Sequence, residues 1–231
     1  MLRSIAAATA LLLTACAPTT GPRTAIDREL ANVVNPSAVI ATELAFARTA
    51  REEGQWTAFR EYAAGDAVMF VPQAVQAQDW LRGRTDPAQA VQWQPHAVWM
   101  SCDGSLAVTR GAAQWPDGRP GSFVTVWERQ RDGGYKWVLD RGEFVERPLP
   151  VPDFIQTEVA KCAGTTSAAA VRPQSTLGPP ASTHQRTAKD QSLTVADFAW
   201  QDGRSETWML ITRDGGTTVV DLGEHRPVDS N

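Results

Sequence analysis

The stretch Cys102–Phe144 constrains the fold of this chain more than any other. It contains three runs rich in Val, Thr, Phe and Trp, and Asp-Gly steps precede or separate these runs. Asp-Gly favours the positive φ angles of tight hairpin turns, whereas β-branched and aromatic residues are typical of strands. The runs are Leu106–Trp115, Ser122–Gln130 and Tyr135–Phe144. Together they predict an antiparallel meander.

The segment before this meander is predicted to form helices that pack on one face of the sheet. Three strands alone bury too little apolar surface to offset the entropy lost on folding, so the sheet needs packing on one face. Asn35-Pro36 is typical of a helix start, and apolar residues follow at helical spacing up to Gly54. Downstream we predict a short helix from Trp56 to Gly65 and strands over Ala67–Val71 and Val91–Ser101.

The same segments carry a resemblance to a known family. Residues 101–111, the run Phe123-Val124-Thr125-Val126-Trp127 and residues 132–142 resemble the SnoaL-like, DUF4440 branch of the NTF2-like superfamily. With the upstream helices the resemblance covers about residues 36–146, an ordinary domain size. It implies an α+β fold, an NTF2-like cone in which a curved antiparallel sheet packs on N-terminal helices and leaves a pocket at its wide end. Because the superfamily includes isomerases, dehydratases, cyclases and members with no known reaction, function must be argued from the site.

The N-terminal residues have the sequence pattern of a targeting segment. Arg3 precedes a short apolar run, and Leu13-Thr14-Ala15-Cys16 matches a lipoprotein lipobox. We predict a signal peptide over 1–15, lipid attachment at Cys16 and a polar tether over 16–34. The protein would then be lipid-anchored in the cell envelope, facing the periplasm. Ala17, which is not the Asp of inner-membrane lipoproteins, favours the outer membrane.

The rest of the chain divides by composition. After a predicted NTF2-like domain over 35–164, residues 165–191 are rich in Ala, Ser, Thr, Pro and Gln and predict a linker. Residues 192–231 contain three strand-like runs separated by Asp-Gly and predict a small β-meander, a C-terminal β appendage that pairs with the main sheet or packs on it. Phe154–Lys161 is compatible with a short helix.

Two residues are the candidates for acid or base chemistry. Asp140 interrupts an apolar strand, and a carboxyl group between apolar walls has the raised pKa that a general acid or base needs. Strand alternation would place Asp140 on one face and Trp137, Leu139 and Arg141 on the other. The resemblance implies that Asp140 lies near the strand acid or histidine of catalytic members. His96 is the second candidate, and a structural ion pair between Asp140 and Arg110 stays open.

The remaining site predictions concern binding. Met69, Trp99, Arg110 and Trp127 are predicted to contact a ligand in the cone, with core packing as the alternative for the tryptophans. Glu43 is predicted to be solvated, as single charges on helices usually are. Because no second ligand residue accompanies His96, we expect no metal, and we expect no cofactor.

Partners follow from charge and cysteines. With a net charge of −4 and interspersed signs, the chain lacks the basic stripe of nucleic-acid binding. Cys102 and Cys162 remain as an even pair in an oxidising compartment and predict a disulfide. We expect a homodimer through the open sheet face and a small apolar or amphipathic ligand. The alternatives are an isomerase or hydro-lyase, and a structural protein whose cone is filled by its own side chains.

Overall fold

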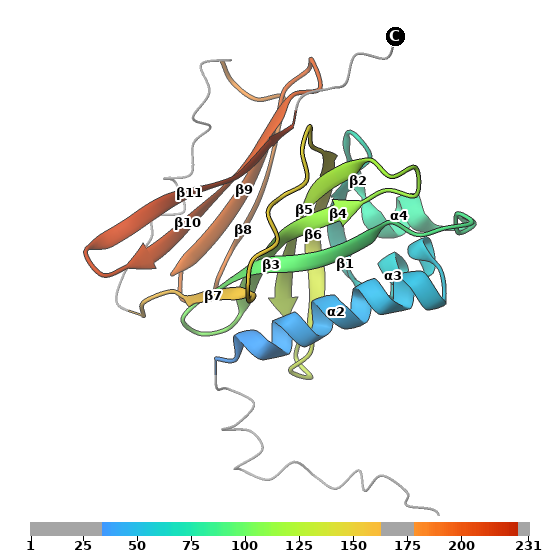
Figure 1. Cartoon of the computed structure of the whole chain (residues 1–231). Helices are drawn as coiled ribbons and strands as arrows, with labels where there is room; N and C mark the ends of the chain where they lie inside the picture. Colours follow the sequence, from blue (N-terminus) through green and yellow to red (C-terminus); the bar gives the residue numbers. More distant parts are fainter. Residues whose placement is uncertain (1–33, 163–177, 226–231) are drawn as a thin grey trace, which may run out of the picture. The chain divides into compact units, whose positions relative to one another are not determined.

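The computed structural model describes residues 34–162 and 178–225. The predicted signal peptide, Cys16 and the tether up to residue 33 lie outside the described residues, as do residues 163–177 and 226–231. Within the described ranges three helices and eleven strands follow one another along the chain (Figure 1). They are α2 (Pro36–Glu52), α3 (Gln55–Tyr62), β1 (Ala63–Phe70), β2 (Ala74–Gln76), α4 (Ala77–Leu81), β3 (Gln92–Met100), β4 (Leu106–Gln114), β5 (Pro120–Arg129), β6 (Tyr135–Phe144), β7 (Gln156–Val159), β8 (Ser182–Thr187), β9 (Leu193–Ala199), β10 (Ser205–Arg213) and β11 (Gly216–His225).

The main sheet has seven strands in the order β2-β1-β6-β5-β4-β3-β7. The predicted meander forms its centre, because β3, β4, β5 and β6 pair antiparallel in sequence order. The sheet is nevertheless mixed, since β1 runs parallel to β6 and β7 runs parallel to β3. The predicted helix over Phe154–Lys161 is therefore wrong, and part of that segment is the edge strand β7.

The N-terminal helices cover one face of this sheet, as the α+β prediction required (Figure 1). Asn35 caps α2 by accepting a hydrogen bond from the Ser37 amide at 3.1 Å, and Pro36 occupies the first helical position. The covered face holds an aromatic core in which the Phe46 ring lies 4.9 Å from Phe59 and 4.8 Å from Trp93. The helices and the sheet together form the cone.

A second sheet covers the other face of the main sheet. It is antiparallel with the order β11-β10-β9-β8, and its Leu193, Val195 and Met209 share a buried apolar cluster with Val124 and Val126 of β5. The C-terminal appendage is thus four-stranded and packs on the sheet. Its first strand, β8, falls inside the predicted linker 165–191. The open face on which the homodimer prediction rested is therefore occupied.

One extra residue in β6 changes which side chains share a face. Trp127 of β5 pairs with Trp137, but the neighbouring Val126 pairs with Leu139, so Val138 is unpaired between them. This β-bulge places Trp137 in the cluster under the helices and Leu139 in the cluster between the sheets. The prediction that Trp137, Leu139 and Arg141 share one face is wrong for this reason.

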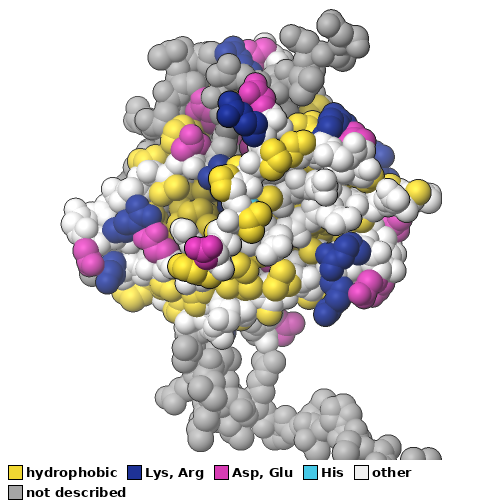
Figure 2. Space-filling model, in the orientation of Figure 1, with side chains coloured by type: hydrophobic (Ala, Val, Ile, Leu, Met, Phe, Trp, Pro, Cys, Tyr) yellow, Lys and Arg dark blue, Asp and Glu magenta, His cyan; other side chains and the backbone are white. Residues whose placement is uncertain are grey.

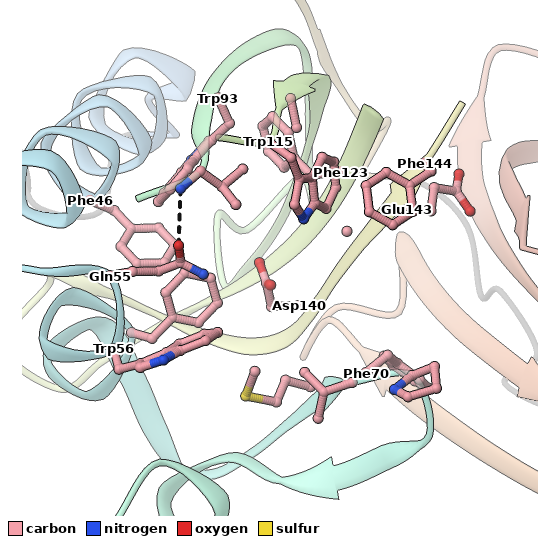
Figure 3. A pocket seen from close by; sticks show the side chains of 17 residues that line it. Phe46, Gln55, Trp56, Phe70, Trp93, Trp115, Phe123, Asp140, Glu143 and Phe144 are labelled. Carbon is pink, nitrogen blue, oxygen red and sulfur yellow. Dashed lines mark hydrogen bonds between the residues drawn. The ribbon is translucent and has the colours of Figure 1, made fainter. Parts of the chain in front are cut away.

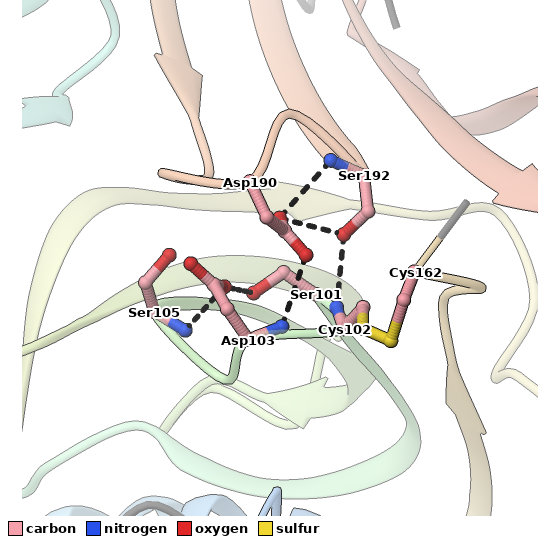
Figure 4. Close-up of a disulfide and its surroundings, with 7 residues drawn as sticks. All are labelled: Ser101, Cys102, Asp103, Ser105, Cys162, Asp190 and Ser192. Atoms are coloured by element: carbon pink, nitrogen blue, oxygen red, sulfur yellow. Dashed lines mark hydrogen bonds between the residues drawn. A yellow bond between two sulfur atoms is a disulfide. The ribbon is translucent and has the colours of Figure 1, made fainter. Parts of the chain in front are cut away.

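A disulfide joins Cys102, in the turn before β4, to Cys162, beyond β7 (Figure 4). The two Cα atoms are 5.0 Å apart, within the range that a disulfide spans. Beside it the Cys102 amide donates to Ser192 Oγ at 2.8 Å and the Asp103 amide donates to Asp190 at 3.0 Å. The turn is therefore fixed both to the end of the first domain and to the loop that starts β9.

Candidate functional site

A cavity of about 280 Å³ lies between the helices and the main sheet (Figure 3). Most of its walls are apolar, and aromatic rings from both layers predominate. The rings belong to Phe46, Trp56, Phe59, Phe70, Trp93, Trp115, Phe123 and Phe144. The cone is thus partly filled by its own side chains but keeps an open space, which does not fit the alternative of a completely filled cone.

Two acidic residues, Asp140 and Glu143, line this space, and the Asp140 carboxyl group is the one that lies among the aromatic rings (Figure 3). It lies on β6 beyond the bulge, and its Oδ2 accepts a hydrogen bond from Thr125 Oγ1 on β5 at 2.7 Å. Burial, the largest cause, raises the pKa of Asp140 to about 7; the bond from Thr125 opposes this shift and the charge of Glu43 adds to it. A carboxyl group with this pKa can give or take a proton near neutral pH.

Gln55 brings a second polar group to the cavity. The Val91 amide donates to Gln55 Oε1 at 2.9 Å, which fixes the side-chain amide so that its NH₂ group is the end left for the cavity (Figure 3). An amide NH₂ can only donate, whereas an ionised carboxylate can only accept. Asp140 and Gln55 therefore offer complementary hydrogen-bonding groups within one apolar space.

Glu43 is not solvated, and that prediction is wrong. Its side chain is fully buried beneath the cavity, where Trp93 Nε1 donates to it at 2.7 Å, Trp127 Nε1 at 3.0 Å and Thr109 Oγ1 at 2.5 Å. Burial raises the pKa of Glu43, whereas these three hydrogen bonds lower it. Because the charge of Glu43 contributes to the raised pKa of Asp140, the site holds two acids that interact.

The structure separates the predicted ligand residues into two groups. Met69 lines the cavity with Asp140, and Trp127 lies below it as a donor to Glu43. His96, Trp99 and Arg110 line a different groove, of about 350 Å³, which the cavity does not include. Trp99 packs against the cluster between the two sheets, so this groove lies on the other face of the main sheet and the three residues are not part of the cone.

The expected ion pair between Asp140 and Arg110 is not formed. Arg110 Nε is buried without a hydrogen-bond partner, and Asp140 is bonded to Thr125. Burial and the charge of Arg110 lower the pKa of His96. With His96 on the opposite face, Asp140 is the predicted acid or base that the structure places in the cavity.

Two other kinds of feature are absent from the described residues. Across 34–162 and 178–225, no group of three or more His, Cys, Asp or Glu side chains is arranged to hold a metal ion. In the same ranges no helix has the length and apolar character needed to span a membrane. Figure 2 shows acidic and basic side chains interspersed over the face in view, without a continuous patch of either sign.

Comparison with known proteins gave matches among solved structures alone. No protein-family model matches the chain, and no curated protein matches it. A protein assigned as a ketosteroid isomerase from Parabacteroides distasonis is 17% identical, with a TM-score of 0.39, over 50% of this chain and 97% of its own.

Two further structures match at a similar level. An NTF2-like protein of unknown function from Methylobacillus flagellatus is 15% identical, with a TM-score of 0.36, over 47% of this chain and 90% of its own. The Δ5-3-ketosteroid isomerase from Mycobacterium sp. is 13% identical, with a TM-score of 0.34, over 47% of this chain and 93% of its own. Similarity at this level leaves function to be argued from the site.

Proposed function

We propose that this protein binds a small, largely apolar molecule in the cone, and that Asp140 contacts the polar group of that molecule. The observation that carries the proposal is the 280 Å³ aromatic cavity into which Asp140 projects. Apolar walls with a few placed polar groups are typical of small-molecule sites. The NTF2-like resemblance of the sequence is consistent with such a pocket.

The cavity suggests what its ligand looks like. Aromatic rings on several sides favour a flat ring system, because apolar area and ring contacts supply most of the binding free energy. Asp140 and the Gln55 amide then select a hydroxyl or carbonyl group on that ring. A bicyclic molecule with one oxygen substituent meets both requirements.

Naphthalene and 2-naphthol, which differ by one hydroxyl group, test the binding proposal. We expect the wild-type protein to bind 2-naphthol about tenfold more tightly, because a hydrogen bond to a charged group contributes about 1.5–3 kcal/mol. Replacing Asp140→Leu should bring the two affinities together, since the apolar walls remain. Titration calorimetry or ligand fluorescence measures both constants.

Ala113→Trp provides the control for position. Ala113 lines the cavity and is 8% exposed, so an indole there should fill the space and abolish binding of both probes. Unchanged binding of 2-naphthol in this variant would place the probe elsewhere and contradict the proposal.

We propose proton transfer as a second candidate function, of the isomerase or hydro-lyase type. The observation that favours it is the pKa of Asp140 near 7 with the buried acid Glu43 beside it. Two acids that interact supply the paired titratable groups on which acid–base catalysis often depends. The substitution Asp140→Asn separates the two functions, because it keeps the shape of the side chain and removes its proton chemistry.

We also propose that Cys16 carries a lipid and anchors the domain to the envelope, with the outer membrane favoured. The lipobox before Cys16 supports this. We expect the mature chain of the producing bacterium to begin at acylated Cys16 and to sediment with membranes, and Cys16→Ser to remain unprocessed. Mass spectrometry of the N-terminal peptide checks this, and a soluble mature chain with an unmodified Cys16 would contradict it.

A further inference from the structure

A second and larger cavity lies where one end of the second sheet packs on the main sheet. Its volume is about 740 Å³, and residues of both sheets line it. Trp200 and Phe144 provide aromatic walls, and Arg141, His184, Ser182 and Ser205 provide polar groups. The first cavity is lined by Asp140 and the second by Arg141, so two successive residues of β6 serve different spaces.

Arg141 is a buried cation whose bonding capacity is only partly used. The residue is 5% exposed, and it forms a salt bridge with Asp197 of β9, which is fully buried. Arg141 also donates to Ser205 and, at 3.4 Å, to Thr207 Oγ1. A guanidinium group has five N–H donors, and these three bonds leave two without an acceptor among the described residues.

Aromatic rings and hydrogen-bonding groups surround the guanidinium group of Arg141. Its carbon lies 4.5 Å from the centre of the Phe70 ring, which in turn meets the His184 ring edge-on at 5.9 Å. Asp197 Oδ2 accepts from Thr207 Oγ1 at 2.8 Å, while its Oδ1 is buried without a partner. A guanidinium group held by these contacts, with spare donors at the wall of a cavity, is well suited to bind a planar acceptor.

We propose that this inter-sheet cavity is a second ligand site that takes a small aromatic carboxylate, with the carboxylate on Arg141 and the ring against Trp200 and Phe144. Two parallel N–H donors match the two oxygens of a carboxylate, which a point charge such as lysine would not do. His184 on the same wall adds a ring N–H donor, and Asp202, which also lines the cavity, is already paired with Arg204. Phe144 and Pro72 line the cone cavity as well, whereas Arg141 and His184 line the inter-sheet cavity and not the cone.

The probe is 4-fluorobenzoate, followed by ¹⁹F NMR on the full chain, with 4-fluorobenzamide as its neutral counterpart. We expect saturable binding of the acid, about tenfold tighter than the amide, because charge-assisted hydrogen bonds are stronger than neutral ones. Ser182 and His184 line the cavity from alternate positions of β8, so Ser182→Trp should block it and abolish binding. Thr183 lies between them and is exposed, which makes Thr183→Trp the matched control that keeps affinity.

Two more variants test where the probe binds and what Arg141 contributes to its binding. Ala113→Trp closes the cone and should leave 4-fluorobenzoate binding unchanged. The paired replacement of Arg141→Met and Asp197→Leu removes the ion pair without leaving one charge buried, and should fold yet lose the preference for the acid. Equal binding of acid and amide, binding lost in Ala113→Trp but kept in Ser182→Trp, or no binding at millimolar probe would each overturn the proposal.

Discussion

Asp140→Asn should lower the rate of any proton transfer in the cone by roughly 10²–10⁴, while lowering probe affinity by no more than about tenfold. Asparagine can still accept the bond from Thr125, so the cavity keeps its shape. A suitable reaction is the exchange of the α-protons of 2-tetralone, a bicyclic ketone, in D₂O, followed by NMR. Exchange no faster with wild-type protein than in buffer would leave binding as the function of the cone.

The same variant should be more stable than the wild type at alkaline pH. Because burial raises the pKa of Asp140 to about 7, the folded protein keeps this proton at pH values where the unfolded chain has released it. The stability that the carboxyl group contributes is complete below its unfolded pKa, near 4, and is lost as the pH rises through 7. We expect the advantage of the variant to grow by on the order of 2–3 kcal/mol from about pH 5 to pH 8.

Urea unfolding at the two pH values measures this difference. Asp153→Asn, at an exposed carboxylate, is the control and should show little change between them. A stability difference between Asp140→Asn and wild type that is independent of pH would contradict the raised pKa and, with it, the acid–base candidate.

Arg141→Met should cost about 3–5 kcal/mol of unfolding free energy at neutral pH. The substitution leaves Asp197, which has no exposed surface, as an unpaired charge between the two sheets. Adding Asp197→Leu should recover most of the loss, because replacing both partners of a buried pair by apolar residues is often neutral or stabilising.

An exposed ion pair provides the comparison for this prediction. Arg82 and Asp79 form a salt bridge with side chains 78% and 67% exposed, and such pairs contribute about 0–1 kcal/mol. Arg82→Met should therefore change the urea midpoint little. Similar losses in Arg82→Met and Arg141→Met would show that the inter-sheet pair does not couple the sheets.

Local patterns predicted the elements well and their long-range partners poorly. The Asp-Gly turns and the Asn35-Pro36 helix start act over a few residues, so β4 to β6 and α2 are found close to their predicted ends. The parallel pairing of β7 with β3 depends on contacts between residues about 60 positions apart, which no local signal reports. Strand β8 was missed because its polar composition resembles that of a linker.

The candidate site was predicted in part for similar reasons. Asp140 lines the cavity, whereas face assignments by simple alternation failed across the bulge. Glu43 carried a signal that could have revealed its burial, because it lies four residues from both Val39 and Ala47 in the apolar stripe of α2. Its partners come from three separate strands, β3, β4 and β5, and only the folded sheet brings them together.

The unpaired Val138 has a consequence for how this chain can change over time. Beyond the bulge, Asp140 and Arg141 point to opposite faces of the main sheet. The helices pack on the first of these faces and the second sheet packs on the other. Losing or gaining one residue in β6 would exchange the two, placing a cation in the aromatic cone and a carboxylate against Asp197. Neither cavity could accommodate the exchanged side chain by a local rearrangement of its walls. The strand can therefore diverge by substitution, but its length is fixed.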